Sequence, residues 1–492
     1  MFFYSSFAKK SVFYTFLQIL PALAGIIILR IYSSLLTREE YAVLAMLTTT
    51  STLSLIINSL CMDQVITRYY YDHVHDRKKL DDFFLSVISV MVALLFVIIA
   101  FVFIIPQGIN EYLFKGMLEN MQWQFIASVL VGFALSLYKS LLSFQRNEQA
   151  HFKVLILTLS ASVLQVAFVW IGIRFFQNSV LGAQLGKFAG IALPTIVLIF
   201  MYFAGRKASI KFALIREVVP FFAPLVLYGL MYWGVSQFDQ VLFQMRMQSL
   251  ELLALYVMAF NIALFADLIL SGLSSFIIPE MNMIMKQQTD TGRISNYIHL
   301  FVLMSCFSIL AVSLAGNLMT DFYLDPKYGS IGWIIDGLLI GYIFRMLYTI
   351  YSFPVYYQKK TMILTIALGI SLAISLSVNW FLIPSAGIFA LLLSNFLSRF
   401  SQAWLTAGLA RKMSTIPFNR MKVFGLTVIF VLLLLSLMII GYFTRVNHYL
   451  AISAAFIIAV LTALILFRKQ LPVLISLLRD GFLKNRHENL KH

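Results

Sequence analysis

Residues 179–204 read SVLGAQLGKFAGIALPTIVLIFMYFA, and this stretch decides the class of fold. It exceeds the roughly 20 predominantly apolar residues that a helix needs to cross the hydrocarbon core of a bilayer. Gly182, Gly186 and Gly190 stand four apart, a spacing of small residues that lets helices approach closely in lipid. Lys187 is the one charge before the stretch ends. The pattern predicts a membrane-spanning helix that packs tightly on a neighbour and carries a cation within the membrane.

The composition of the whole chain agrees with a membrane protein. Of its 492 residues 61% are hydrophobic and 12% are charged, whereas a soluble domain is about half apolar and a quarter charged. A soluble enzyme, a secreted disulfide scaffold and a disordered protein are therefore excluded. The two cysteines, Cys61 and Cys306, lie in apolar segments and imply no disulfide framework. The first residues lack a small-residue cleavage site, so we interpret them as part of a retained first span.

Hydropathy predicts fourteen spans along the chain. The runs are too long and too uniformly apolar for the alternating strands of a spanning barrel, so all are expected to be helices. The connecting loops are short and leave no room for a soluble catalytic domain on either side. The predicted spans cover residues 11–36, 41–67, 83–105, 121–144, 153–173, 179–204, 218–245, 251–280, 296–318, 331–357, 361–382, 385–410, 423–443 and 447–467.

Lysine and arginine are distributed unevenly between the two sides of the membrane. With the N-terminus placed in the cytoplasm, 26 of the 37 Lys and Arg fall in inner segments and 6 in outer ones. Such an excess is typical of cytoplasmic loops. We therefore expect a multi-pass protein of the cytoplasmic (inner) membrane with both termini in the cytoplasm. The same bias explains most of the net charge of +16, so no nucleic-acid partner is expected.

Weak internal matches at an offset near 210 indicate a duplicated six-span unit. The matches pair Glu40-Tyr41-Ala42-Val43-Leu44 with Glu251-Leu252-Leu253-Ala254-Leu255, Leu137-Tyr138 with Leu347-Tyr348, and the glycine series of residues 179–204 with Ala390, Ser394 and Ser398. Internal repeats of this kind are typical of transporters with a substrate site between the repeats. The predicted fold class is an all-α integral membrane protein of about 14 transmembrane helices. Its parts are an N-terminal six-helix lobe (1–210), a pseudo-symmetric C-terminal six-helix lobe (211–421), an extra helix pair (422–467) and a cytoplasmic tail (468–492).

Two passages resemble a known family. Asn379-Trp-Phe-Leu-Ile-Pro384-Ser-Ala-Gly387-Ile-Phe-Ala390 resembles the N-x-x-L-I-P-x-x-G-I-x-G-A-A passage of polysaccharide flippases, and Glu39-Glu40-Tyr41-Ala42-Val43-Leu44 resembles the E-E-Y-G-x-Y/L passage that opens their second span. Ala42 and Ala390 stand where that family often has Gly. The family handles O-antigen and other lipid-linked oligosaccharides and belongs to the multidrug/oligosaccharidyl-lipid/polysaccharide exporter superfamily. The resemblance covers essentially the whole chain and implies a V-shaped, two-lobe fold with alternating access.

Charges inside the predicted spans are the candidate functional residues. Each costs about 2.5–3.5 kcal/mol at the bilayer centre on insertion scales, so it is expected to face a cavity or a partner. A basic excess suits a diphosphate, which Arg binds through forked donors and Lys as a point charge. The acidic residues are candidates for ion coupling or charge pairing. The proposed substrate-binding set is Arg30, Lys139, Lys187, Arg345 and Arg399, and the acidic set is Asp63, Asp239 and Asp267, with Asp336 near an outer end.

Each assignment has a simpler alternative. Lys139 lies near a span end and can snorkel to the interface. Arg30 and Asp239 can snorkel or pair with each other, and Asp63 can pair locally beside Arg68. The aromatic residues of the seventh predicted span can stack on sugars or simply pack; they are Tyr228, Tyr232 and Trp233.

The predicted function is that of a flippase, not an enzyme. It would move polyprenyl-diphosphate-linked oligosaccharide from the inner to the outer leaflet by alternating access, for cell-envelope polysaccharide such as the O-antigen of lipopolysaccharide. No P-loop and no metal-spacing cluster occurs in the sequence, so neither a cofactor nor a metal is expected. Expected partners are this lipid, membrane lipids, a coupling proton or sodium ion, and the polysaccharide polymerase machinery. Two alternatives within the superfamily stay open, namely a flippase for the lipid-linked peptidoglycan precursor and a multidrug/cation antiporter. A membrane polymerase or ligase is disfavoured because no large outer loop exists.

Overall fold

The computed structural model describes residues 20–287, 291–358, 360, 362–411, 420–443, 448–468 and 472. The beginning of the first predicted span and almost all of the predicted cytoplasmic tail lie outside the described residues. Within them the chain is helical throughout, without a β-strand.

Among the described residues, twelve helices are long and apolar enough to cross a membrane, whereas hydropathy predicts fourteen spans over the whole chain. The two exceptions still coincide with helices. The first is a shorter apolar helix over Leu20–Leu35, the described part of the first predicted span. The second, Ile388–Ala410, is interrupted by polar side chains such as Asn395, Arg399 and Gln402, which lower its hydropathy. The chain is thus a multi-pass, all-helical membrane protein with twelve candidate spans in its described part.

Residue contacts divide the chain into two compact units. We call the described residues up to 254 the N-terminal unit, and the described residues from 255 onward the C-terminal unit. The lobe boundaries predicted from the repeat concern internal symmetry rather than contacts, and they stay a prediction.

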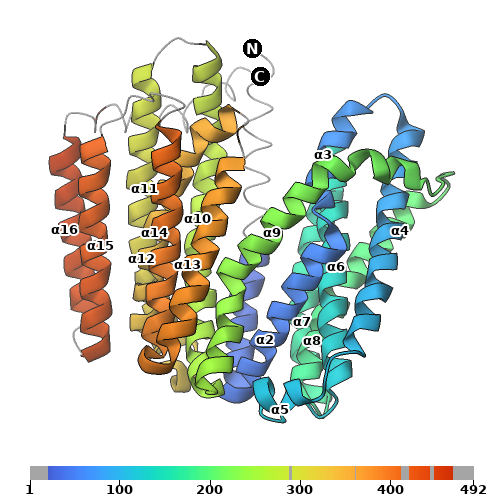
Figure 1. The fold of residues 1–492 in the computed structure, drawn as a ribbon, viewed down its shortest axis with the longest axis horizontal. Helices are drawn as coiled ribbons and strands as arrows, with labels where there is room; N and C mark the ends of the chain where they lie inside the picture. The colour runs from blue at the N-terminus through green and yellow to red at the C-terminus, as the bar shows by residue number, and fades with distance from the viewer. Residues whose placement is uncertain are drawn as a thin grey trace. The chain divides into compact units, whose positions relative to one another are not determined.

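After the Leu20–Leu35 helix, the N-terminal unit contains eight labelled helices (Figure 1). They are α2 (Arg38–Ser59), α3 (Met62–Asp72), α4 (Arg77–Val102), α5 (Gly108–Phe114), α6 (Met121–Asn147), α7 (His151–Phe175), α8 (Ser179–Phe203) and α9 (Phe212–Met247). Helix α6 packs on α2, α4 and α8, and α8 packs most extensively on α7. The long helix α9 contains Pro220 and Pro224 and is little buried.

Seven labelled helices belong to the C-terminal unit, with α10 crossing its boundary. They are α10 (Leu250–Gln287), α11 (Thr291–Leu318), α12 (Gly332–Tyr357), α13 (Met362–Ala386), α14 (Ile388–Ala410), α15 (Arg420–Phe443) and α16 (His448–Phe467). A π-helical turn over Met319–Tyr323 and a short 3-10 turn over Pro326–Tyr328 follow α11. Helix α12 is the centre of this unit because 83% of its most apolar segment is buried and α11, α14 and α15 all pack on it.

The Glu-Glu-Tyr passage forms the beginning of α2. The Thr37 hydroxyl accepts a hydrogen bond from the Glu40 backbone N–H at 3.2 Å, and the Glu40 carboxylate accepts one from the Thr37 N–H at 2.7 Å. This reciprocal capping satisfies two backbone donors that a helix start leaves unpaired.

The second predicted span is broken into α2 and α3. Leu60 and Cys61 both have left-handed backbone conformations, with φ of 45° and 55°. Non-glycine residues rarely adopt them. The break was not predicted, because neither residue is a turn former and the whole segment is apolar.

The Leu-Ile-Pro passage ends α13 and turns the chain directly into α14. Gly387 is the only residue between the two helices, with φ 54° and ψ −126°. This conformation is open to glycine and strained for residues with a Cβ atom. The glycine of this passage is therefore required by a one-residue helical hairpin.

Both small-residue series lie against the preceding helix. A Cβ atom on Gly186 would overlap the backbone carbonyl of Phe168 in α7, and one on Gly182 would overlap that of Gly172. In the C-terminal unit the Ser394 hydroxyl of α14 lies 3.0 Å from that of Ser375 in α13. Close approach is achieved by glycine in one pair and by serine hydrogen bonds in the other.

A polar network ties together the ends of four helices in the N-terminal unit. The Asp81 carboxylate contacts Arg77, Tyr202 and Arg206, and Arg77 also pairs with Glu148. The adjacent Asp82, which is fully buried, binds Lys211 Nζ at 2.6 Å and the Ser209 backbone N–H at 2.7 Å. We call these eight residues the Asp81–Asp82 network. It fixes α4, α6, α8 and the start of α9 to one another.

Candidate functional site

An ion pair within the C-terminal unit joins two of the predicted site residues. Arg345 on α12 donates from Nε to Asp267 Oδ1 on α10 over 3.3 Å. The side chains of Arg345 and Asp267 are 25% and 31% exposed, so the pair is accessible rather than sealed in the core. The guanidinium also lies over the ring of Tyr348, 5.2 Å from its centroid. The sequence placed these two residues in different roles, whereas the structure places them in contact.

Arg399 reaches the same helix from α14. Its guanidinium lies over the Tyr342 ring at 4.1 Å, a cation–π contact that lowers the cost of a cation in the membrane. Gly341 makes the crossing possible, since a Cβ atom there would overlap Asn395 Oδ1 and lie 2.9 Å from Arg399 Cδ. The same Asn395 oxygen is buried and has no hydrogen-bond partner among the described residues.

These contacts bring two guanidinium groups to one stretch of α12. Tyr342, which Arg399 covers, and Arg345 are three residues apart on α12, so their backbone positions lie within about one helical turn. Guanidinium forks match the oxygens of phosphate and carboxylate groups. The arrangement is therefore suited chemically to binding a dense anion, with Asp267 compensating part of the positive charge.

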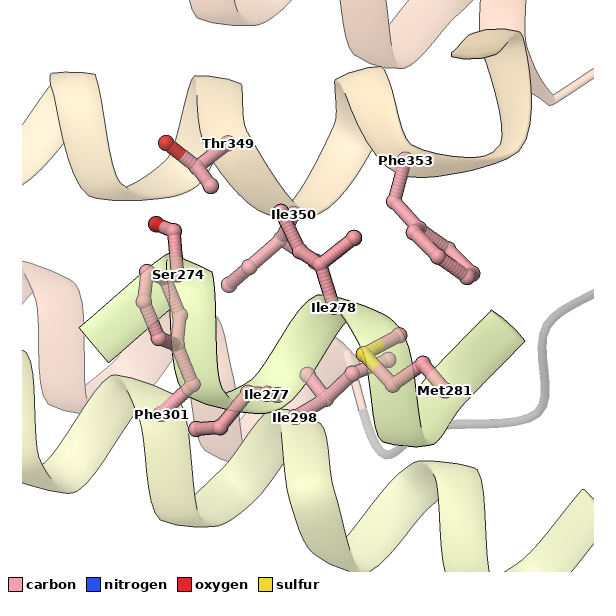
Figure 2. A pocket seen from close by; sticks show the side chains of 9 residues that line it. All are labelled: Ser274, Ile277, Ile278, Met281, Ile298, Phe301, Thr349, Ile350 and Phe353. Atoms are coloured by element: carbon pink, nitrogen blue, oxygen red, sulfur yellow. The ribbon is translucent and has the colours of Figure 1, made fainter. Parts of the chain in front are cut away.

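An apolar cleft continues along α10 and α12 from the ion pair. It is narrow, with a volume of about 20 Å³, and is lined by Ser274, Ile277, Ile278, Met281, Ile298, Phe301, Thr349, Ile350 and Phe353. Figure 2 shows Ser274 and Thr349 at one end and Met281 and Phe353 at the other. Both hydroxyls are hydrogen-bonded to carbonyls of their own helices, at 2.7 and 3.1 Å. Thr349 is one turn beyond Arg345, so a charged region and an apolar one follow each other along α12.

Lys187 occupies a different environment in the N-terminal unit. It is half-buried on α8, and none of the hydrogen bonds and ion pairs of the described residues involves its ammonium group. One turn earlier, Gln184 is 3% exposed, and both of its amide atoms lack hydrogen-bond partners in the described part of the chain.

The other predicted site residues of this unit lie on four different helices. Arg30 and Lys139 are exposed on the Leu20–Leu35 helix and on α6. Asp239 is buried on α9 and accepts a hydrogen bond from the Gln240 N–H at 2.8 Å. Asp63 is half-buried at the start of α3, where its backbone carbonyl accepts from the Ser143 hydroxyl at 2.6 Å.

Two of the simpler alternatives can be judged from contacts. Local pairing of Asp63 with Arg68 is not observed, because Arg68 pairs with Asp72, one turn further on, at 3.9 Å. Trp233 has a packing role, since its indole N–H donates to the Thr49 carbonyl and to the Thr52 hydroxyl, both at 3.1 Å. These contacts attach α9 to α2.

Sequence reasoning missed the polar and aromatic neighbours of the charges. Tyr342 and Tyr348 flank Arg345 at spacings of three, which a search for aromatic residues one turn from each embedded charge would have found. Asn395 is four residues before Arg399, and Gln184 is three before Lys187. Asn and Gln stand out less than charged residues in a hydropathy profile, although burying an amide group without a hydrogen-bond partner is also costly.

The comparisons with known proteins are structural. No family model and no curated protein matches the sequence. A solved structure described as lipid II flippase MurJ in an inward closed conformation is similar with a TM-score of 0.69 and 12% identity, over 94% of this chain and 99% of that one. An inward-facing multidrug resistance MATE family transporter of the MOP superfamily is similar with a TM-score of 0.60 and 14% identity, over 80% and 94%.

The chain therefore shares its overall helical fold with these two solved structures, the second of which is described as a member of the superfamily that the sequence passages resemble. At 12–14% identity the likeness describes the fold and leaves the substrate open.

Proposed function

We propose that this protein is a flippase for polyprenyl-diphosphate-linked oligosaccharide, moving it from the inner to the outer leaflet for cell-envelope polysaccharide synthesis. The observation that carries the proposal concerns two guanidinium groups beside α12. Arg345 belongs to this helix, and Arg399 reaches its Tyr342 from α14. A diphosphate has the charge density and the oxygen geometry that two such groups recognise.

The surroundings of this pair support an amphiphilic substrate. An apolar surface of methyl and aromatic side chains begins one turn beyond Arg345. A lipid with a charged headgroup and an isoprenoid chain matches a charged region that is followed by an apolar region along α12. Coupling to a proton or sodium ion is assigned to the acidic residues Asp239 and Asp267.

The second candidate is a flippase for the lipid-linked peptidoglycan precursor. The specific observation in its favour is that the structure named lipid II flippase MurJ matches this chain over 94% of its length, against 80% for the MATE transporter. A multidrug antiporter is the third candidate, and the basic excess within the spans argues against cationic substrates.

The test is a lipid extraction from cells that lack the protein. We expect polyprenyl-diphosphate oligosaccharide to accumulate in the inner leaflet while surface polysaccharide is lost. Accumulation of the peptidoglycan precursor, identified by its mass, would select the second candidate. Sensitivity to cationic toxins without any lipid accumulation would select the third.

Complementation of the same cells tests the site. Arg345→Ala and Arg399→Ala should each fail to restore surface polysaccharide at an unchanged protein level. Lys207→Ala, in the exposed connection after α8, is the matched control and should restore it. Equal activity of all three variants would contradict the assignment of the guanidinium pair.

A further inference from the structure

The ion pair between Asp267 and Arg345 differs from the buried ion pair that attaches α4 to the start of α9. In the buried pair, Asp82 is fully buried and accepts a hydrogen bond from Lys211 Nζ at 2.6 Å. By contrast, the Asp267 side chain is 31% exposed, the Arg345 side chain is 25% exposed, and their contact measures 3.3 Å. Strong hydrogen bonds between a cationic nitrogen and a carboxylate oxygen are about 2.7–2.9 Å long. The contact of Asp267 with Arg345 is therefore loose and accessible enough for another anion to replace the carboxylate.

Arg345 has a second contact that does not depend on Asp267. Its guanidinium lies 5.2 Å from the centroid of the Tyr348 ring, and Tyr348 is 3% exposed. Tyr348 is three residues after Arg345, so the contact is local to α12. An aromatic ring attracts a cation that lies over its face. The guanidinium is therefore held at the site even when its carboxylate partner is exchanged.

The Asp267 carboxylate and the proposed substrate need the same guanidinium group. A polyprenyl diphosphate carries negative charge on each phosphate, and phosphate oxygens match the donors of a guanidinium fork. If both anions contacted Arg345, two like charges would lie within a few ångströms of each other, which is unfavourable. Binding of the diphosphate and the contact with Asp267 therefore compete.

This competition keeps Arg345 compensated before and after the substrate binds. A cation within a membrane span is costly unless it has a partner. In the empty protein the partner is Asp267, and in the loaded protein it is the diphosphate. A state in which Arg345 has neither anion is disfavoured. Exchange of one anion for the other therefore favours two states of the site, one empty and one loaded.

We infer that Asp267 is a competing anion at the diphosphate site, which the substrate displaces from Arg345 and which promotes release of the substrate when it returns. The inference rests on the proposed flippase function and deepens it, because it assigns the release of the diphosphate to a named carboxylate. The competition requires no proton or sodium ion and exists at equilibrium in the purified protein. A carboxylate that only oriented Arg345 would have the opposite effect, since it would strengthen binding of the diphosphate.

The competition can be measured by isothermal titration calorimetry on the purified full-length protein in detergent. The probe is inorganic pyrophosphate in a buffer without divalent metal ions. Asp267→Asn keeps the shape of the side chain and removes its charge. We expect this variant to bind pyrophosphate about fivefold more tightly than the wild type, the upper range for the contribution of a partly exposed ion pair.

Two further variants frame this result. Arg345→Ala should weaken pyrophosphate binding about tenfold or more, because a charge-assisted hydrogen bond is lost. Glu251→Gln, at an exposed position of α10, is the matched control. It removes the same charge from the same helix and should leave the affinity unchanged.

The direction of the change in affinity decides the inference. Unchanged or weaker binding by Asp267→Asn would overturn it, because the carboxylate would then not compete for Arg345. Absence of pyrophosphate binding to the wild-type protein would also overturn it. Asp267→Glu keeps the charge and should bind as the wild type does. Asp267→Ser is a second uncharged variant and should show the same tightening, so the result does not depend on the folding of one variant.

Lipid extraction from cells that lack the protein separates the inference from the proposed function. If the oligosaccharide lipid accumulates but Asp267→Asn binds pyrophosphate less tightly, the flippase proposal stands and the inference fails. If Asp267→Asn binds more tightly but no such lipid accumulates, the competition at an anion site stands and the flippase proposal fails.

Discussion

Charged side chains within the membrane segments of this chain have distinct kinds of partner. Arg345 has a carboxylate and an aromatic ring, and Arg399 has an aromatic ring. Lys187 is accompanied by an unsatisfied amide. Compensation within the protein makes a membrane charge stable, whereas incomplete compensation leaves it available to a ligand.

At Gly341 the site depends on the absence of a side chain. We expect Gly341→Ala to reduce surface polysaccharide strongly in the complementation assay, because the new methyl group displaces Asn395 and Arg399. The atoms that must move belong to side chains rather than to the backbone. The free energy of unfolding should therefore change little, and the melting temperature of the purified variant can check this. A variant with wild-type transport would show that the position of Arg399 over Tyr342 is not required.

The Asp267–Arg345 pair offers a second residue-scale prediction. Asp267→Asn removes the counter-charge of Arg345 but keeps the shape of the side chain. For a partly exposed pair the stability loss should be about 1 kcal/mol or less. If Asp267 also couples an ion, the variant should lose most of its transport activity even though its free energy of unfolding changes little. Equal transport by Asp267→Asn and the wild type, at the same expression level, would exclude Asp267 as a coupling residue.

The identity of the site charges was predictable from the sequence, but their contacts were not. Hydropathy isolates Arg345, Arg399 and Lys187 because a charge is conspicuous in an apolar run. Asp267 and Arg345 are 78 residues apart, and their contact depends on how α10 packs near α12. Periodicity carries no information about that packing. Whether the eight predicted site residues serve a common substrate stays a prediction.

Some helices of this chain are held together by close backbone packing at glycines, and others are held together by ion pairs. Helices α7 and α8 meet through glycines, and the ends of α4, α6, α8 and α9 meet through the Asp81–Asp82 network. The glycine contacts between α7 and α8 have no space for an added atom. The Asp81–Asp82 network depends on its charges. The two kinds therefore fail under different substitutions.

Glycine packing between α7 and α8 gives a prediction about stability. Gly186→Ala would place a methyl group 2.6 Å from the carbonyl carbon of Phe168, where backbone and not side chain must move. We expect a loss of about 1–3 kcal/mol, the usual cost of overpacking, measured as a lower melting temperature in detergent. Gly425→Ala, on α15 with open space around the glycine, is the control and should not lower it. Identical melting of the two variants would contradict the packing argument.

The buried carboxylate of Asp82 gives a second prediction about stability. Asp82→Asn removes a buried carboxylate that accepts hydrogen bonds from Lys211 Nζ and from the Ser209 N–H, whereas the Lys211 side chain is itself half exposed. We expect destabilisation of about 2 kcal/mol, since a hydrogen bond to a charged group contributes about 1.5–3 kcal/mol. Substitution of the exposed Asp76, which only caps α4 through the Lys79 N–H, should cost about 1 kcal/mol. The comparison of unfolding midpoints checks the order, and a larger effect at Asp76 would refute it.

At the scale of the whole molecule the fold consists of two units whose helices the sequence largely anticipates. Every predicted span coincides with a helix in its described part, because a continuous apolar run in lipid has no other way to satisfy its backbone. Hydropathy overestimated the count of clearly apolar spans, since α14 mixes apolar residues with Asn, Gln, Arg and several serines. It also gave no sign of α5 or of the Leu60–Cys61 break, which depend on local backbone conformation.

The predicted orientation in the membrane is testable on the intact molecule. In a version with Cys61 and Cys306 replaced by Ser, we expect a membrane-impermeant maleimide to label Glu119→Cys in intact cells. Lys78→Cys, on the side assigned to the cytoplasm, should react only after permeabilisation. Both positions are exposed, so accessibility within the fold does not bias the comparison. The reverse pattern would invert the topology derived from the Lys and Arg bias.

The break between α2 and α3 has a consequence for the exchange of backbone hydrogens with solvent. The first N–H groups of α3 have no helical acceptor before them, since Gln64 and Val65 already share the Cys61 carbonyl. Deuterium can therefore enter this segment near residue 62, between two protected stretches, rather than only at its ends. An exchange experiment would see an early-labelling window inside what hydropathy presents as one continuous span.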